Sequence, residues 1–307
     1  MDFDLFVQQL VNGLTLGSVY ALVALGYSMV YGILKLLNFA HGEVFMIGAF
    51  CGYFVLIGLG GAENPIVPVG VLLLLMFLAG MLGSGILGVV IERFAYRPLR
   101  NAPRIAPLIS AIGVSFFLQA FALLLFGADI RSYETPKLIS PTTGIDAGPL
   151  RISLVRILVI ASTVILMILL TLLVSRTKLG KAMRATSYDR EAAEMMGIDV
   201  NRVIVMTFLI GSILAGAGGV MVGLLFGRIF HFMGFIVGLK AFTAAVVGGI
   251  GSLPGAMLGG LLIGMAEAFS TAYISSTFQN LIVFAVLVVF LLLRPQGLLG
   301  KPLPSKV

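Results

Sequence analysis

The residues best placed to do chemistry are three polar side chains that interrupt a long apolar stretch near the N-terminus. Asn38, His41 and Glu43 lie within a few residues of one another, with Gly42 among them. A carboxylate and an imidazole in apolar surroundings are costly unless they are paired or hydrated, so this cluster is typical of a substrate pathway, a gate or a proton relay. An ordinary interfacial turn, with Glu43 favoured by the dipole of the helix that follows, is the alternative.

A second interruption and a second acidic residue are candidates for the same pathway. Gly249, Gly251, Ser252 and Pro254 separate two apolar runs, and glycine and proline in such positions break helices. In membrane transporters, broken segments in the two halves of a chain are the best sequence indication of the binding site. Glu267, an acid within the next apolar run, is a further candidate for the pathway.

Residues 176–202 form a polar segment with the pattern of a short helix outside the membrane. Asp189 or Ser187 can cap the start of this helix, Thr186 and Asp189 have the spacing of a capping box, and Gly197 is a suitable C-terminal stop. A merely solvated loop has little need for this order, so we predict a helix.

The predicted helix has one apolar and one charged side. The apolar side consists of Ala192, Met195 and Met196, and the charged side of Arg190, Glu191 and Glu194. Such a helix can lay its apolar side in the groove of a partner protein while the charges set its orientation. A surface helix lying on anionic lipid is the alternative.

Membrane helices must position all of these residues. The chain of 307 residues is 59% hydrophobic and 11% charged, whereas a soluble chain is about half apolar and one-quarter charged. We therefore predict an all-α polytopic membrane protein with a single transmembrane domain over residues 1–307. Nine apolar runs are visible, at about 5–33, 44–60, 67–91, 105–127, 153–175, 203–227, 236–250, 255–273 and 279–293. The run 236–250 is short and either crosses or re-enters, which gives eight or nine spans.

The positive charges of the loops predict the orientation. The loop 92–104 carries Arg93, Arg97, Arg100 and Arg104, and residues 176–202 are also rich in lysine and arginine. Both segments are cytoplasmic by the positive-inside rule, which puts Met1 outside. The connection 128–152 is then the largest external feature, and its proline and glycine residues predict an ordered irregular loop.

One helix face is made of small residues. Gly211, Ala215, Gly219, Gly223 and Gly227 recur at four-residue spacing. Such a face lets helix backbones approach closely in lipid. It indicates either packing inside the bundle or a seam against a second permease.

Several classes of function are excluded by composition. The chain has one cysteine and two histidines that lie far apart, so it offers neither an internal disulfide nor a zinc-ligand spacing. It contains no GxxxxGK[ST] loop, so partner subunits would have to use any ATP. The net charge of +7 lies in short loops and indicates topology, not nucleic-acid binding. We expect no cofactor or metal bound by this chain and no enzyme active site.

With these features the chain resembles the LivH-type permeases of branched-chain amino acid importers, which belong to the ATP-binding-cassette (ABC) class. The segment Glu191–Ala193 followed by Gly197 is similar to the EAA-x3-G loop of ABC-importer permeases, the coupling helix that sits in a groove of the ATPase. The likeness continues through four further segments in order, at residues 12–22, 37–43, 108–113 and 240–256.

The resemblance implies a bacterial cytoplasmic-membrane complex embedded in lipid. Its other members would be a second, LivM-like permease, two ABC ATPase subunits and an external substrate-binding protein. The resemblance assigns the coupling role to Arg190, Glu191, Ala192, Ala193 and Gly197. The candidates for the substrate pathway remain the residues of the two interruptions and Glu267.

Three other functions stay open from the sequence. Similar permeases belong to importers of urea or short amides, so the substrate is open. An ion-coupled secondary carrier would use His41, Glu43 and Glu267 as a proton relay. A passive channel or a membrane scaffold is the third alternative.

Overall fold

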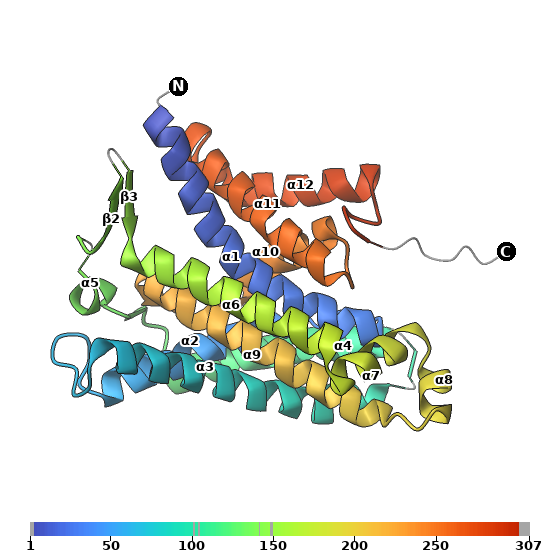
Figure 1. Ribbon diagram of the computed structural model, residues 1–307. Coiled ribbons are helices and arrows are strands. Elements are labelled where there is room, and N and C mark those ends of the chain that lie inside the picture. Colours follow the sequence, from blue (N-terminus) through green and yellow to red (C-terminus); the bar gives the residue numbers. More distant parts are fainter. Residues whose placement is uncertain (1–2, 101, 104, 141, 148–149, 301–307) are drawn as a thin grey trace.

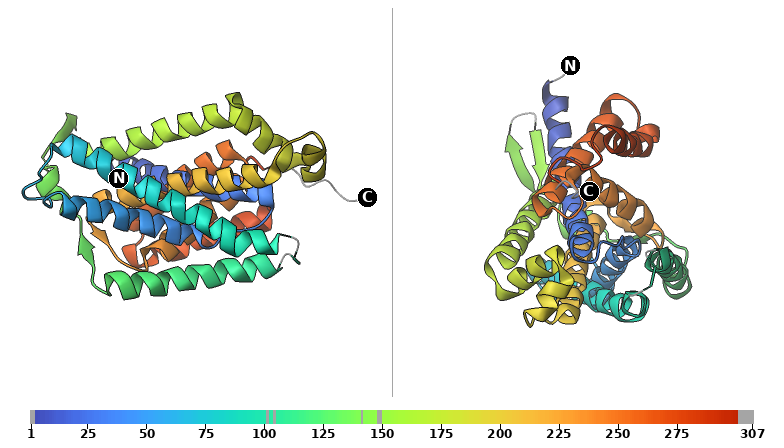
Figure 2. Two further views of the ribbon diagram at one scale, coloured as in Figure 1. Left: turned by 90° about the horizontal axis from the view of Figure 1, so that it is seen from below. Right: turned by 90° about the vertical axis from the view of Figure 1, so that its right-hand side faces the viewer.

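The computed structural model describes residues 3–100, 102–103, 105–140, 142–147 and 150–300. Met1 and Arg104, which contributed to the predicted orientation, lie outside these residues. Long helices run roughly along one direction, with α7 and α8 at one end and the short strands at the other (Figure 1; Figure 2). The positive-inside rule makes the end with α7 and α8 cytoplasmic.

Eight helical segments of the described residues are long and apolar enough to cross a membrane. They are α1 (Phe3–Leu34), α2 (His41–Gly58), α3 (Val69–Ile91) with η1 (Glu92–Tyr96) and η2 (Arg97–Leu99), α4 (Ile105–Phe126), α6 (Leu154–Arg176), α9 (Val200–Phe226), α11 (Leu253–Tyr273), and η3 (Ser276–Phe278) with α12 (Gln279–Leu293). These segments match the predicted apolar runs to within a few residues. The prediction of an all-α polytopic membrane protein is confirmed.

A shorter helix, α10 (Met233–Gly248), accounts for the run that sequence left open. Just before it, β4 (Arg228–Ile229) pairs antiparallel with β1 (Arg131–Ser132) at the external end. Just after it, the N–H groups of Leu298 and Leu299 donate to the carbonyls of Val247 and Gly248. The chain therefore passes from one end of the bundle to the other through α10.

The external connection is more regular than predicted. It contains β1, the short helix α5 (Thr135–Leu138), and a hairpin of β2 (Gly144–Ala147) with β3 (Leu150–Ser153). Tyr133 anchors it, because this buried side chain packs against Gly223 and its Oη donates to the Ala49 carbonyl at 2.5 Å. The predicted irregular loop is thus a pair of short ladders that one tyrosine holds to α2 and α9.

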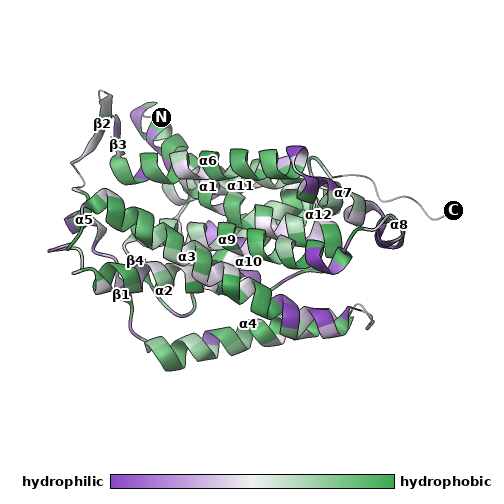
Figure 3. Ribbon diagram, turned by 60° about the horizontal axis from the view of Figure 1, so that its bottom comes forward, coloured by the Kyte–Doolittle hydropathy of each residue, from purple (hydrophilic) through white to green (hydrophobic). Residues whose placement is uncertain are grey.

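The cytoplasmic segment also contains more structure than the single predicted helix. It folds into α7 (Lys178–Tyr188) and α8 (Arg190–Met195). Hydrophilic residues gather on α7, α8 and other helix ends, whereas the outer surfaces of α3, α4 and α6 are hydrophobic along their length (Figure 3). This is the distribution that a bilayer requires.

The core lies between α1, α2, α9 and α11. Most residues of α1 and α9 are buried, whereas few residues of α6 and α12 are. The small-residue face of α9 packs inside the bundle, since Gly211 lies against Gly26, Gly219 against Phe45, and Gly223 against Tyr133. The alternative of a seam against a second permease on this face is wrong.

The most extensive helix contact is that of α1 with α11. A Cβ placed at Gly13 would lie 2.8 Å from Met265 Cα, and one at Gly17 would lie 2.7 Å from Leu261 Cα. From the α11 side, a Cβ at Gly260 would collide with the Ala21 backbone. Glycine is required here because two backbones meet.

We expect Gly260→Ala to lower the thermal stability of the purified protein, because overpacking a tight contact costs about 1–3 kcal/mol. Gly113→Ala on α4 is the matched control, since no heavy atom of the described residues lies within 4 Å of a Cβ there. Helix propensity alone favours that control by up to about 1 kcal/mol. Thermal unfolding in detergent tests both, and equal Tm changes for the two variants would contradict the packing argument.

Candidate functional site

The first interruption of the sequence is held by an aromatic hydroxyl from η1. The chain leaves α1 at Lys35, which has a left-handed φ of 57°. Buried Asn38 then accepts a hydrogen bond at Oδ1 from the Tyr96 hydroxyl at 3.1 Å, and the same hydroxyl lies 3.1 Å from the Leu37 carbonyl oxygen. Asn38 thus fixes the path of the chain between α1 and α2.

His41 lies deep in the bundle at the first position of α2. Its imidazole Nε2 lies against Gly26 of α1, where a Cβ would overlap the ring, and its ring meets Tyr27 edge-on at 4.8 Å between centroids. Gly26 is eight residues before the end of α1, which corresponds to about 12 Å along the helix axis. The interruption therefore folds back into the bundle.

Glu43 joins α2 to α4 through polar contacts. Its fully buried carboxylate accepts at Oε1 from Gln119 Nε2 at 2.8 Å and from Ser115 Oγ at 3.1 Å. Neither Glu43 Oε2 nor His41 Nε2 has a hydrogen-bond partner among the described residues. Gly42 between them packs against Gly234 on α10. Two buried polar atoms of this cluster are therefore left without a partner among the described residues.

The second interruption shapes the cytoplasmic end of α10. Gly249 and Gly251 have φ of 107° and 88°, which glycine adopts without strain. Ser252 caps α11 by accepting from the Gly255 N–H at 3.2 Å, and Pro254 occupies its first turn. Gly249 packs against Gly297 of the C-terminal segment. These residues turn the chain between two helices and do not contact the Glu43 cluster.

Glu267 has two partners that sequence reasoning missed. Its Oε1 lies 2.6 Å from Lys240 Nζ on α10, and its Oε2 accepts from the Tyr20 hydroxyl of α1 at 2.8 Å. All three side chains are buried. The sequence does contain a signal for this pair, because one apolar run has a single lysine and the next has a single glutamate.

The caps of α8 are those predicted from the sequence. Asp189 Oδ1 accepts from the Ala192 N–H at 3.1 Å, and Gly197 ends the helix with a φ of 80°. Thr186 takes no part, because it lies buried within α7, and the predicted capping box is wrong.

The residues of α8 divide between an inner and an outer side. Ala193 is buried, and Ala192 is half-buried. Glu191 is exposed, and Met195 and Met196 are 81% and 82% exposed. An exposed pair of methionines is a suitable contact surface for a partner.

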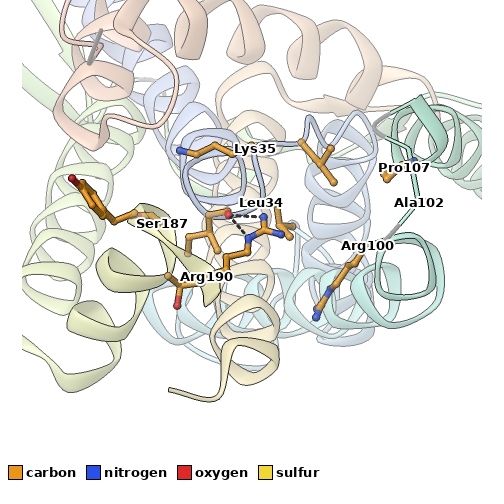
Figure 4. Close-up of a pocket in the computed structure, with 11 residues that line it drawn as sticks. Leu34, Lys35, Arg100, Ala102, Pro107, Ser187 and Arg190 are labelled. Atoms are coloured by element: carbon orange, nitrogen blue, oxygen red, sulfur yellow. Dashed lines mark hydrogen bonds between the residues drawn. The ribbon is translucent and has the colours of Figure 1, made fainter. Parts of the chain in front are cut away.

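Arg190 faces inward, whereas Glu191 and Glu194, with which the sequence grouped it, are exposed. Its guanidinium donates from Nη2 at 2.7 Å and from Nε at 3.2 Å to the Ile33 carbonyl at the end of α1 (Figure 4). Burial lowers the pKa of Arg190, as does the nearby charge of Arg100, whereas Glu194 raises it. The side chain borders a cavity of about 310 Å³ that Lys35 and Ser187 also line. Arg190 therefore ties α8 to α1.

Comparison with known proteins identifies the family. Residues 9–291 match the family described as the permease component of the branched-chain amino acid transport system. The chain belongs to this permease family. It is 44% identical over 305 residues to the high-affinity branched-chain amino acid transport system permease protein BraD of Pseudomonas aeruginosa, with 98% of each chain covered. It is 42% identical over 315 residues to the corresponding LivH of Escherichia coli K12, with 100% of this chain and 99% of the relative covered.

The family decides between several of the functions that sequence left open. The permease is a multi-pass membrane protein and a transport component, not an enzyme. It is not a secondary carrier or a scaffold.

In the permease, α10 connects three places that sequence treated as one pathway. Gly234 and Gly238 contact Gly42 beside the Glu43 cluster, Lys240 binds Glu267, and the C-terminal end of α10 leads into the Gly249 turn. A displacement of α10 would therefore alter all three places.

We expect Gln119→Leu to destabilise the permease by about 1.5–3 kcal/mol, because it removes a donor from a buried carboxylate. Combining it with Glu43→Met should recover most of that loss, since no charge is then left unpaired. Thermal unfolding measures the stability of the single and double variants. Uptake by the double variant then tests whether Glu43 belongs to the substrate pathway or only stabilises the packing of the helices. Full uptake would show that the Glu43 carboxylate has only a packing role.

Arg190→Ala should loosen α8 from α1. It leaves the Ile33 carbonyl without its charged donor, and such a bond contributes about 1.5–3 kcal/mol. Hydrogen exchange of residues 188–197 should accelerate, whereas the exposed Lys181→Gln on α7 should change nothing there. Unchanged exchange in the arginine variant would show that the bond does not hold the helix.

Proposed function

We propose that this permease is one of two membrane subunits of an ABC importer for branched-chain or related small amino acids in the bacterial cytoplasmic membrane. Its partners are a second, LivM-like permease, two ATPases on the cytoplasmic side and a substrate-binding protein outside. The permease itself binds no cofactor, and ATP is hydrolysed by the partner subunits. The names of the relatives support the substrate class.

The observation that carries the coupling role is the division of α8 into an outer and an inner side. Met195, Met196 and Glu191 face outward at the cytoplasmic end, where an ATPase groove can receive them. Arg190 and Ala193 face the membrane domain. A force applied to the outer side therefore reaches the transmembrane helices through the inner side.

The path of that force starts at the end of α1. Arg190 binds the last turn of α1, and α1 packs without gaps on α11 through Gly13 and Gly17. Closure of the ATPases on ATP would move α8, and α1 would follow together with the helices packed on it. The access of the pathway would then switch from outside to inside.

The other surfaces suit the remaining partners. The exposed apolar side chains of α4, α6 and α12 suit lipid and the second permease. The external ladders, held in place by Tyr133, suit a rigid platform for the binding protein.

Gly197→Pro should abolish coupling while leaving insertion intact. Proline cannot adopt the φ of 80° that ends α8, and it removes the Gly197 N–H that donates to the Glu194 carbonyl. We expect ATPase activity that no longer responds to the loaded binding protein, together with a loss of amino acid uptake. Glu191→Lys, which reverses an outward charge, should weaken the same response.

Gly61→Pro is the matched control on the external side. Gly61 has a φ of 75°, donates its N–H to the Leu56 carbonyl and has open space around it. It therefore carries the same backbone defect far from α8. Normal stimulated hydrolysis and uptake in Gly197→Pro, measured in proteoliposomes of the full complex, would overturn the coupling role.

A further inference from the structure

The permease contains a cavity of about 510 Å³ that the mechanism above does not use. Its walls come from the external halves of α1, α9 and α11, the start of α6 and of α12, and α10. The volume lies in the range of about 300–1,000 Å³ that is usual for small-molecule sites. The cavity is therefore large enough for an amino acid, and it lies in the external part of the bundle.

The floor of the cavity is the buried cluster of Tyr20, Lys240 and Glu267. Closer to the cytoplasmic end of the same helices, Gly260 of α11 meets Ala21 of α1, and Gly259 meets Ala244 of α10. These contacts leave no space between the helices. The pocket thus ends at these contacts, and its buried charged groups are an anion and a cation.

The ionised side chains of this pocket are not needed to stabilise the fold. A buried ion pair contributes little to stability compared with apolar residues of similar volume, and ionisable groups inside a membrane mark functional sites by default. Arg156 at the rim is half-buried and makes no hydrogen bond or ion pair to any residue that the structure describes. Glu267 uses one lone pair on each oxygen, so each oxygen can accept another donor.

The opposite wall is apolar. Val222 and Leu225 of α9 together with Met233 and Val237 of α10 face the same space. The pocket, which the exposed Arg228 also lines, therefore combines an anion, three cations and an aliphatic wall. Urea or a short amide has no charge to pair with these groups, whereas an amino acid carries one charge of each sign and an apolar side chain.

We propose that this pocket binds a zwitterionic aliphatic amino acid within the membrane domain. Glu267 receives the α-ammonium group, Lys240 and Arg156 receive the α-carboxylate, and the wall of α9 and α10 contacts the side chain. This proposal rests on the proposed function and narrows its substrate class to zwitterions. It also makes the permease, and not the binding protein alone, a determinant of specificity.

The test measures binding of radiolabelled leucine to the full complex in nanodiscs, without binding protein and without ATP. Competitors are 4-methylpentanoate, which lacks the ammonium group, 3-methylbutylamine, which lacks the carboxylate, and urea. We expect unlabelled leucine to displace the radiolabel well and the three other compounds to displace it poorly. Glu267→Gln should weaken leucine binding by about tenfold and reduce its advantage over 4-methylpentanoate.

Two further variants separate binding from structure. Arg156→Gln, at the half-buried rim, should weaken leucine binding but leave the weak binding of 3-methylbutylamine unchanged. Exchanging the pair, Lys240→Glu with Glu267→Lys, keeps an ion pair in the bundle but reverses the charges that meet the ligand, so leucine binding should be lost. Asp4→Asn, at the external end of α1 and outside the pocket, is the matched control and should bind as the unmodified complex does.

The outcomes distinguish this proposal from the proposed function. Leucine binding that survives the exchanged pair, or that is absent in the unmodified complex while uptake with binding protein is normal, overturns the pocket. Strong competition by urea overturns the zwitterion specificity. Failure of the unmodified complex to take up leucine with loaded binding protein and ATP overturns the proposed function itself.

Discussion

Direct contact between helix backbones is the constraint on which this permease depends. Lipid tails are as apolar as leucine, so helices in a membrane gain little from burying apolar side chains and are held instead by close packing. The contacts of α11 with α1 meet this requirement at Gly17 and Gly260, and those of α9 with α2 meet it at Gly219. Polar groups lie beside such contacts, as the imidazole of His41 does at Gly26.

The polar groups of the membrane domain fall into separate clusters, each shared by helices distant in sequence. Glu43 links α2 to α4, Glu267 links α11 to α1 and α10, and Arg190 links α8 to α1. Because no water competes for hydrogen bonds in the hydrocarbon region, the links of Glu43 and Glu267 are specific as well as costly to break. They restrict the ways in which the helices can move past one another.

The sequence predicts well what is determined locally. Apolar run length located the helices, and Asp189 and Gly197 located α8, because caps depend on residues close in the chain. It predicts poorly what is determined by contacts across the bundle. Nothing near Tyr133 indicates that its hydroxyl reaches Ala49, and nothing near Arg190 indicates that it turns inward to Ile33. For the same reason, the sequence does not show that the two interruptions and Glu267 lie at different places along α10.

The helix α9 has a mechanical consequence of its own. It begins directly after α8, and at its far end it holds the ring of Tyr133 at Gly223 and leads into the strand that pairs with the external ladder. With 27 residues it spans about 40 Å as one uninterrupted rod. Its backbone hydrogen bonds run from one face of the membrane domain to the other, so α9 ties the position of the cytoplasmic helices to that of the external strands.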